Sequence, residues 1–495
     1  MFRKALRLGT LMLVILYLIG SLSACKGPAS SDEEESSRLP TPTPSLTPTP
    51  TPTDWGITHP LEVWSYSDDI RFMTDVFMVY NPCVKVEYVE FSSVDELYRQ
   101  SVLAAAGTAD CPDVIVMDSR LAEEFVNKDY LLYDLSDFKP LVDAMEIYPN
   151  VVETGTNDIT GEIRALSYQN TPGVVMYRRS LAREHFGTDD PSEIQKLMSD
   201  WDKFTEMAET VKTKSEGKSF MLSSVDEFCL PFFNNRRSPW IVDNKLTIDP
   251  MIDDLTELAF TFDRNGYAAH LTSWSSMWFE GMTDQLTDLN DDRLQVFCYF
   301  LTSGEFPTRF NIADNSFTDG DWACVPGPMA YSSGRTCVAV MKDSRCPELA
   351  KCFVQFCTLS EEFLTYWATG VYTQDYLDEL WNRYNDAERV SPTTLSKPAG
   401  DFVSSQKVVE SIIPFFEDSE MTSFLGGQNF YEAFATAALN CPSGVIHDDN
   451  ERIQQLFTEA MHLYAYGDMS KEDMLLSFRT AVKTEFPEIE VEQKN

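Results

Sequence analysis

Acidic and aromatic side chains follow two apolar stretches near the start of the folded part of the chain. LEVWSYSDD carries Tyr66, Asp68 and Asp69, and CPDVIVMDS places Asp118 after a continuous apolar run. A short apolar run of this kind is typical of a buried parallel strand. Ligands of parallel sheets lie beyond the carboxyl ends of the strands. These four side chains are therefore candidates for hydrogen bonds to a polar solute.

Each charged candidate also has a structural explanation. Asp118 precedes LAEEF, so it is equally suited to be a helix N-cap, a position that aspartate favours. Asp68 fits a solvated acid in a loop equally well. Arg335 follows the small residues SSG, where it can donate to a solute or form a salt bridge at the surface. The sequence leaves these alternatives open.

Aromatic candidates lie further along the chain. HLTSWSSMWFEGM contains Trp274 and Trp278, which share one face if this segment is helical. Their polar surroundings favour a stacking platform over a core position. Phe306 ends RLQVFCYFLTSGEF, which reads as an apolar strand followed by a turn of small residues. The flat ring of such a side chain can stack on the apolar face of a ligand.

Strand and helix patterns alternate in the segment that carries the first candidates. We predict strands within residues 61–69, 84–91 and 111–119. The stretch IRFMTDVFMVYNP predicts a helix that ends at Asn81, and VDELYRQSVLAAAG predicts a second helix that ends at Gly107. This βαβαβ order predicts a parallel sheet with helices on both faces.

Five stretches, in order along the chain, carry a family resemblance. They are LEVWSYSDD, SVLAAAGTADCPDVIVMDS, GEIRALSYQNTPGVVMYRRSL, SDWDKFTEMAETVK and DWACVPGPMAYSSGRTCVAVMKDSRCPELAKCFVQF. Together they resemble the extracellular solute-binding proteins of bacterial ABC importers, in the sugar-binding group that includes the maltose-binding protein. The resemblance covers essentially the whole folded body.

The resemblance implies an α/β fold of the type II periplasmic-binding-protein kind, with two α/β lobes, a hinge and an interlobe cleft. The expected segments are a lipoprotein signal peptide (1–24), a disordered tether (25–58), lobe 1 (59–168), lobe 2 (169–328), a return segment of lobe 1 (329–375) and a C-terminal helical segment packed mainly on lobe 2 (376–495).

The same resemblance implies a binding protein that captures a solute, a sugar or oligosaccharide, and delivers it to the permease subunits of an importer. It adds Tyr168, Tyr331 and Tyr431 to the candidate ligand contacts. Sugar hydroxyls need charged or planar hydrogen-bond partners, and the apolar face of a sugar needs a ring. A non-sugar solute is an alternative, because related proteins bind amines, metals and peptides.

The N-terminus is typical of an exported lipoprotein. MFRKALR supplies positive charge and LMLVILYLIG supplies a short apolar run, as in a secretory signal. LSAC then resembles a lipoprotein box, which predicts that Cys25 is lipidated and holds the protein at the outer face of the cell membrane. The Pro-Thr repeat of residues 40–53 predicts an extended spacer of roughly 3 Å per residue.

The composition, and the absence of known catalytic and metal-binding motifs, reduce the number of possible functions. The formal net charge of −39 disfavours nucleic acid as a partner. The sequence contains no HExxH, GxSxG, GxxxxGK[ST] or CxxC motif, so we predict no catalytic residue, cofactor or metal site. A surface glycosidase needs only two carboxylates and remains the rival class. A tethered adhesin or signalling module is a third interpretation. We expect a monomer.

Overall fold

The structure is a computed structural model that describes residues 59–105, 111–273, 275–305, 318–373, 375–379, 400–442 and 451–492, without the side chains of Asp95 and Ala105. These residues form two α/β lobes, each built on its own sheet. Among the helices described, none combines the length and apolar content needed to cross a membrane.

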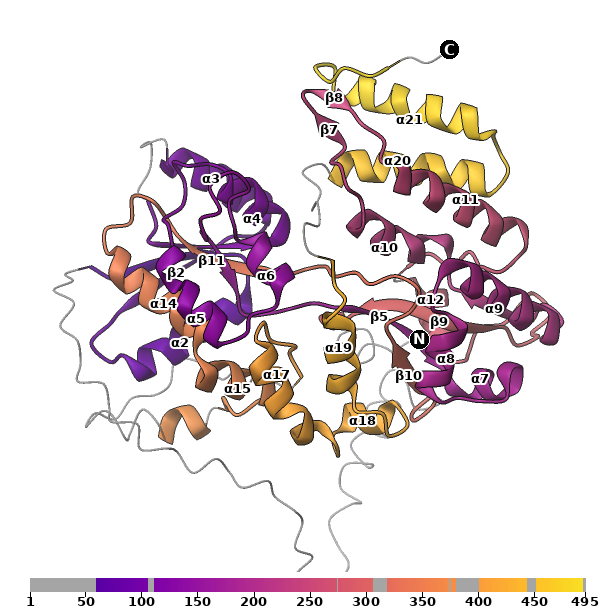
Figure 1. Cartoon of the computed structure of the whole chain (residues 1–495), viewed down its shortest axis with the longest axis horizontal. Coiled ribbons are helices and arrows are strands. Elements are labelled where there is room, and N and C mark those ends of the chain that lie inside the picture. The colour runs from indigo at the N-terminus through magenta and orange to yellow at the C-terminus, as the bar shows by residue number, and fades with distance from the viewer. Residues whose placement is uncertain are drawn as a thin grey trace, which may run out of the picture. The chain divides into compact units, whose positions relative to one another are not determined.

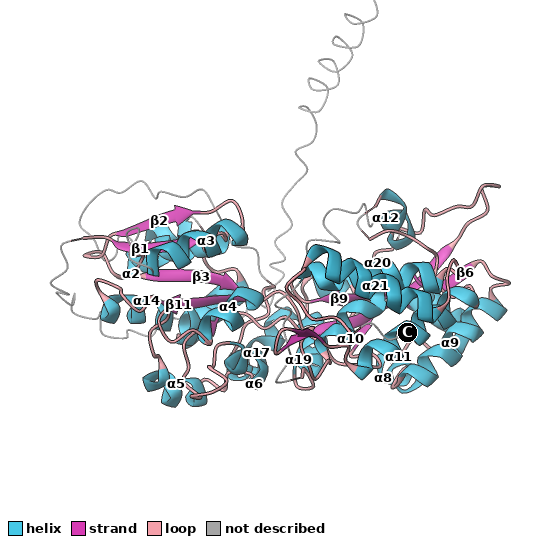
Figure 2. Cartoon of the chain, turned by 90° about the horizontal axis from the view of Figure 1, so that it is seen from above, coloured by secondary structure: helices cyan, strands magenta, loops and turns pink. Residues whose placement is uncertain are grey.

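The sheet of lobe 1 has the strand order β2-β1-β3-β11-β4. The strands β1 and β2 are parallel, as are β1 and β3, whereas β11 runs antiparallel to both of its neighbours. Figure 2 shows β2, β1, β3 and β11 side by side. The bounds are β1 Leu61–Ser65, β2 Val86–Glu90, β3 Val114–Asp118, β4 Leu166–Ser167 and β11 Thr336–Val340. The predicted βαβαβ order is confirmed.

Strand β3 shows how the sequence fills both faces of this sheet. Val114 and Val116 belong to one hydrophobic cluster with α2 and α14, whereas Ile115 and Met117 belong to another with α3 and α4. All four side chains are fully buried. Because successive strand residues point to opposite faces, the continuous apolar run requires helices on both sides. The bounds are α2 Asp68–Tyr80, α3 Val94–Ala105, α4 Ser119–Val126 and α14 Pro347–Leu359. The described part of this lobe also contains η1 Ser136–Phe138, α5 Lys139–Ala144, α6 Pro149–Thr154 and α15 Glu361–Thr369.

The sheet of lobe 2 has the order β10-β5-β9-β6 and is mixed, because only β6 and β9 run parallel within it. Its bounds are β5 Gly173–Arg178, β6 Ser219–Leu222, β9 Gln295–Thr302 and β10 Trp322–Val325, with a separate hairpin β7 Ile241–Val242 and β8 Lys245–Leu246. Its helices are α7 Arg179–Phe186, α8 Pro191–Leu197, α9 Trp201–Lys214, η2 Val225–Phe228, α10 Cys229–Asn234, α11 Pro250–Arg264 and α12 Ser276–Met282.

The C-terminal helices divide into two groups. In the first group, α17 packs on α15 of lobe 1, and α19 packs on the strands β5 and β10 of lobe 2. The second group, α20 and α21, stacks on α11, as Figure 1 shows. The bounds are α17 Gln406–Ile412, η4 Ile413–Phe416, α18 Glu420–Phe424, α19 Phe430–Ala438, α20 Glu451–Ala465 and α21 Lys471–Glu485.

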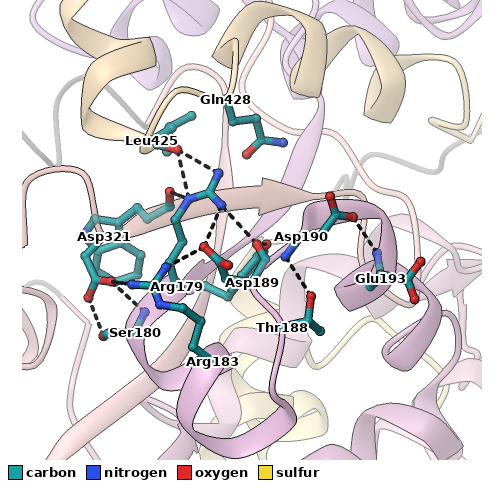
Figure 3. Close-up of polar contacts among 12 residues, drawn as sticks. Arg179, Ser180, Arg183, Thr188, Asp189, Asp190, Glu193, Asp321, Leu425 and Gln428 are labelled. Atoms are coloured by element: carbon teal, nitrogen blue, oxygen red, sulfur yellow. Dashed lines mark hydrogen bonds and ion pairs between the residues drawn. The ribbon is translucent and has the colours of Figure 1, made fainter.

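Arg179 joins the first of these groups to lobe 2. Its guanidinium donates to the carbonyl oxygens of Trp322, Leu425 and Asp189, at 2.8–3.1 Å. Leu425 is the C-cap residue that follows α18, and its carbonyl accepts from Gln428 N as well as from Arg179, so both satisfy an oxygen that the helix itself leaves unpaired. Figure 3 shows Arg179 at the centre of these contacts, with Asp321 bonded to Ser180 beside it.

Two glutamine side chains bond the backbone of the edge strand β10 and of the residues just after it. The Gln428 amide accepts from Cys324 N at 2.7 Å and donates to Cys324 O at 2.8 Å. Gln195 makes the same pair of bonds with Gly327, at 2.8 and 2.9 Å. Each amide imitates a neighbouring strand, which protects an otherwise open sheet edge from pairing with another chain.

The chain passes between the sheets in residues 168–172 and returns in residues 326–335, between the strands given above. A third segment, residues 400–405, lies beside the first: Asn170 N donates to Phe402 O and Ser404 N to Tyr168 O. Gly173 begins β5 under the ring of Tyr331, and a Cβ atom there would lie 2.1 Å from Tyr331 Cζ. Only glycine fits this crossing.

Candidate functional site

The carboxyl edge of the lobe 1 sheet gathers the first candidates. Tyr66 follows β1, Asp118 ends β3, and Thr336 begins β11 directly opposite Asp118 in the ladder. Because β11 is antiparallel to β3, its first residue reaches the same edge as the last residue of β3. We call Tyr66, Asp118, Arg120 and Thr336 the lobe 1 edge cluster.

The two carboxylate oxygens of Asp118 have different partners. Oδ1 accepts from Leu121 N at 2.7 Å and caps α4, as one of the two predicted alternatives required. Oδ2 lies 3.7 Å from Arg120 Nη2, and 28% of the side chain remains exposed. An ionised carboxylate offers about four acceptor positions, so the cap does not exhaust Asp118. The cap and a solute contact are compatible.

Arg120 adds a cation that sequence reasoning missed. Its guanidinium is 36% exposed and lies 3.6 Å from Glu451 in the first turn of α20, in addition to its contact with Asp118. The available signal was its spacing, since Arg120 stands two residues after the strand-ending acid. Thr336 was also missed, because only the pairing of β11 with β3 brings it next to Asp118.

Tyr66 completes the cluster with a half-buried phenol. Burial raises the pKa of Tyr66, and the neighbouring Asp118 carboxylate raises it further, while a hydrogen bond with Thr336 acts in the opposite direction. The phenol is therefore neutral at physiological pH and able to donate a hydrogen bond. Its ring is also available for partial stacking.

Asp68 and Asp69 occupy the first turn of α2, where acidic side chains complement the helix dipole. Asp68 is exposed, as expected of a solvated acid. Asp69 accepts from the hydroxyl of Tyr168 at 3.1 Å. Tyr168 is itself fully buried, with its ring 5.7 Å from that of Trp367. Tyr168 thus holds α2 against the crossing segment, which corrects the expectation that it contacts a solute.

Tyr331 and Arg335 also stabilise the segments that pass between the two sheets. Tyr331 is fully buried, and its hydroxyl lies 3.1 Å from Val174 O and 3.2 Å from Leu301 O. Arg335 is 1% exposed, and its guanidinium donates to the Thr154 and Ser332 hydroxyls, each at 2.8 Å. The sequence offered a solute donor or a surface salt bridge for Arg335, but the side chain is buried and hydrogen-bonded inside the protein.

The predicted stacking platform is corrected as well. Trp278 lies in α12, which begins at Ser276, and its side chain is fully buried. Its indole N–H lies 3.2 Å from Ser223 Oγ, which is an internal partner. Tyr431 is fully buried too, stacked on Phe416 at 4.6 Å, with its hydroxyl donating to Asp401 O. Trp274 and Phe306 lie outside the described residues.

The lobe 1 edge cluster is suited to hydrogen bonding rather than to bond cleavage. It combines a planar carboxylate acceptor, a guanidinium donor and a neutral phenol. Charged hydrogen bonds of this type are about twice as strong as neutral ones. The cluster contains no histidine, and burial raises the pKa of the neighbouring Cys337 thiol to about 12, so neither group is available to activate a hydroxyl as a nucleophile.

The fold of this chain is similar to the folds of several solved proteins. The fold is similar to a solved extracellular solute-binding protein of family 1, with 16% identity, a TM-score of 0.65, and coverage of 86% of this chain and 98% of that chain. It is also similar to the sugar-binding protein MalE from Xanthomonas citri (15% identity, TM-score 0.61, 86% and 97% covered). A third similar structure is the galacto-N-biose/lacto-N-biose I-binding protein of an ABC transporter from Bifidobacterium longum (15% identity, TM-score 0.57, 88% and 99% covered).

No curated protein matches the sequence. Residues 74–376, more than half of the chain, match the family described as bacterial extracellular solute-binding protein. This match includes four of the five stretches in full, whereas LEVWSYSDD (61–69) precedes it. The chain therefore belongs to the bacterial extracellular solute-binding proteins, a family of binding proteins rather than enzymes, as the sequence predicted on both points.

Proposed function

We propose that this protein is the substrate-binding component of an ABC importer and that its solute is a neutral sugar or oligosaccharide. The lobe 1 edge cluster carries the proposal, because its half-exposed carboxylate, guanidinium and phenol are the groups that bind hydroxyls and stack on a sugar ring. Two similar structures are complexes with lacto-N-biose and with β-1,6-galactobiose. The solute would lie between the lobes and favour their closure by contacting both.

We further propose that a lipid on Cys25 holds the protein at the outer face of the cell membrane. The basic start, the short apolar run and LSAC support this location. A diacyl group provides two chains, whereas one chain binds a membrane only marginally. The Cys25→Ala protein should appear in the washed supernatant instead of the membrane fraction. A variant that stays with the membrane would contradict the lipid assignment.

A thermal-shift screen against a sugar panel tests the ligand class. A sugar at 100 times its Kd should raise the stability by about 2.7 kcal/mol. Calorimetry on the sugar that responds should give an affinity that changes little with salt, since a neutral solute forms no ion pair. Small-angle scattering at saturation should show a smaller radius of gyration. If only cations shift the melting curve, and salt weakens their binding steeply, the sugar assignment is wrong and the solute is a charged one.

A further inference from the structure

Three potential metal ligands meet at the amino edge of the lobe 1 sheet, opposite the edge that holds Tyr66 and Asp118. His59 stands two residues before β1, Asp113 directly precedes β3, and Cys346 is the N-cap residue of α14. One ligand atom from each lies within 4.8 Å of the other two. Bonds of about 2.0–2.3 Å to zinc place tetrahedral ligands roughly 3.3–3.8 Å apart, so a side-chain movement of about 1 Å brings all three onto one ion.

We propose that His59, Asp113 and Cys346 bind a structural Zn²⁺ ion, with water in the fourth position. Imidazole nitrogen, carboxylate oxygen and thiolate sulfur are the three ligand types that zinc takes in proteins. The ion would join the chain before β1, the loop before β3 and the loop before α14. This site is separate from the lobe 1 edge cluster and does not depend on the identity of the solute.

Asp113 is the member that most needs a cation. It is fully buried, and no Lys or Arg side chain in the described part of the chain forms an ion pair with it. The nearby Arg345 guanidinium instead pairs with Glu62, at 3.0 Å. A buried carboxylate without a cationic partner is costly, and a bound metal ion is one of the usual means of compensation.

The surrounding hydrogen bonds orient Asp113 and leave it an acceptor position. Oδ1 accepts from Ser344 Oγ at 2.7 Å and from Arg345 N at 2.9 Å, Oδ2 accepts from Glu62 N at 3.1 Å, and the Cys346 thiol hydrogen-bonds the same carboxylate. A carboxylate has about four acceptor positions, and the one that meets the Cys346 thiol becomes available to a metal ion when the ion displaces the thiol proton. Fixed outer partners of this kind are typical of metal-binding carboxylates.

His59 and Cys346 are held in a comparable way. The Nδ1 atom of His59 lies 3.1 Å from Pro60 O, a second contact of the type that sets the tautomer of a ligating histidine. Cys346 N donates to Ser344 Oγ at 3.1 Å, the same hydroxyl that bonds Asp113. His59 is half-buried and Cys346 is 8% exposed, so an ion can enter from the His59 side.

Metal titration of the full-length chain under reducing conditions tests the site. After treatment with a chelator, the protein should bind one equivalent of Zn²⁺. Substituted Co²⁺ should bind in the same ratio and produce the sulfur-to-cobalt charge-transfer absorption of a thiolate ligand. His59→Gln and Cys346→Ser should each weaken binding at least about tenfold, and Cys346→Ser should also abolish the absorption. Cys83→Ser is the matched control, because Cys83 is an exposed thiol that is not one of the three ligands, and it should behave as wild type.

Circular dichroism shows whether each variant is folded, and His59→Gln is the safer of the two because it changes a half-buried residue ahead of the first strand. Zinc should raise the melting temperature of the wild type and of Cys83→Ser, but not that of the His59→Gln/Cys346→Ser double variant. The proposal is overturned if the wild type binds no stoichiometric metal, if the absorption survives in Cys346→Ser, or if folded His59→Gln binds zinc as tightly as wild type does.

Discussion

The carboxyl edges of the two sheets carry similar residue types in different environments. At lobe 1, Asp118 and Arg120 keep 28% and 36% of their side chains exposed. At lobe 2, the chain after β6 contributes Ser223 and Glu227, which are 0% and 8% exposed. Glu227 accepts from Ser223 Oγ at 2.5 Å and from Phe300 N at 2.8 Å, and Ser223 also meets the Trp278 indole.

The difference separates a binding group from a structural one. Ser223 and Glu227 after β6 are buried and hydrogen-bond each other inside the lobe, so they contribute to stability. Asp118 and Arg120 of lobe 1 stay partly exposed, and this is where we propose that a solute binds. Residue type alone does not make this distinction, because a carboxylate and an aromatic ring occur at both edges. The following substitutions test it, from the largest expected effect to the smallest.

Trp278→Ala should destabilise the protein by about 3–5 kcal/mol, because it opens a cavity in a closely packed core. It also removes the indole contact of Ser223. Urea unfolding measures the loss, and calorimetry on the folded fraction should show nearly unchanged sugar affinity. Trp278→Phe is the control, since it keeps most of the volume and should cost less. A loss of affinity without a loss of stability would make Trp278 a ligand contact after all.

Asp118→Asn should weaken sugar binding by about 1–3 kcal/mol while the melting temperature changes little. Asparagine is as good an N-cap as aspartate, but it loses the charge that strengthens hydrogen bonds to hydroxyls. Asp118→Ala should lose the affinity and also about 1 kcal/mol of stability, because the cap on Leu121 N is removed. If the asparagine variant binds as wild type does, Asp118 is a cap only.

Tyr66→Phe should weaken sugar binding by about 0.5–1.5 kcal/mol, the net value of one neutral hydrogen bond. The ring and its stacking surface remain, and only the hydroxyl beside Thr336 is lost. Thr336→Val is the matched variant, because it removes the intramolecular partner of that hydroxyl and not the hydroxyl itself. Equal affinity losses in both variants would place the effect in the Tyr66–Thr336 contact rather than in the solute contact.

The smallest expected effect concerns pH. His462 hydrogen-bonds Asp226, which follows β6, and this bond raises the pKa of His462 above its usual value despite partial burial. The folded state therefore holds the proton more tightly, so the pair stabilises fully below about pH 6.5 and its contribution is lost as the pH rises through the folded-state pKa. Unfolding midpoints measured between pH 6 and 9 should fall more for wild type than for His462→Gln. If the midpoints of wild type and His462→Gln change in parallel with pH, His462 does not contribute to the pH dependence of stability.

Local patterns were sufficient for the elements of lobe 1. Residues 61–69, 84–91 and 111–119 contain β1, β2 and β3, and the helix predicted to end at Asn81 ends at Tyr80. The strands have only five residues each, but their alternating or continuous apolar residues, and the helical spacing in α2, are enough to specify them. The sequence also predicted the cap as one of two alternatives for Asp118, because N-capping depends on residues only a few positions apart.

The local sequence pattern did not predict which side chains are buried or which distant strands pair. The sequence around Trp278 is polar, yet its ring is fully buried, since burial depends on the strands and helices that pack above it. Arg335 and Tyr331 looked like solute contacts because they stand in a crossing, but tertiary packing turns both inward. Thr336 reaches Asp118 only through the pairing of β11 with β3.

By itself, the sequence determined the order of strands and helices in lobe 1, the family and the acidic edge of the first sheet. Tertiary structure alone decided which polar groups at that edge remain exposed, and it alone brought His59, Asp113 and Cys346 together from three distant segments. The physical reason is range: secondary structure and capping arise between near neighbours along the chain, whereas exposure and convergent sites arise only when packing fixes residues that are hundreds of positions apart.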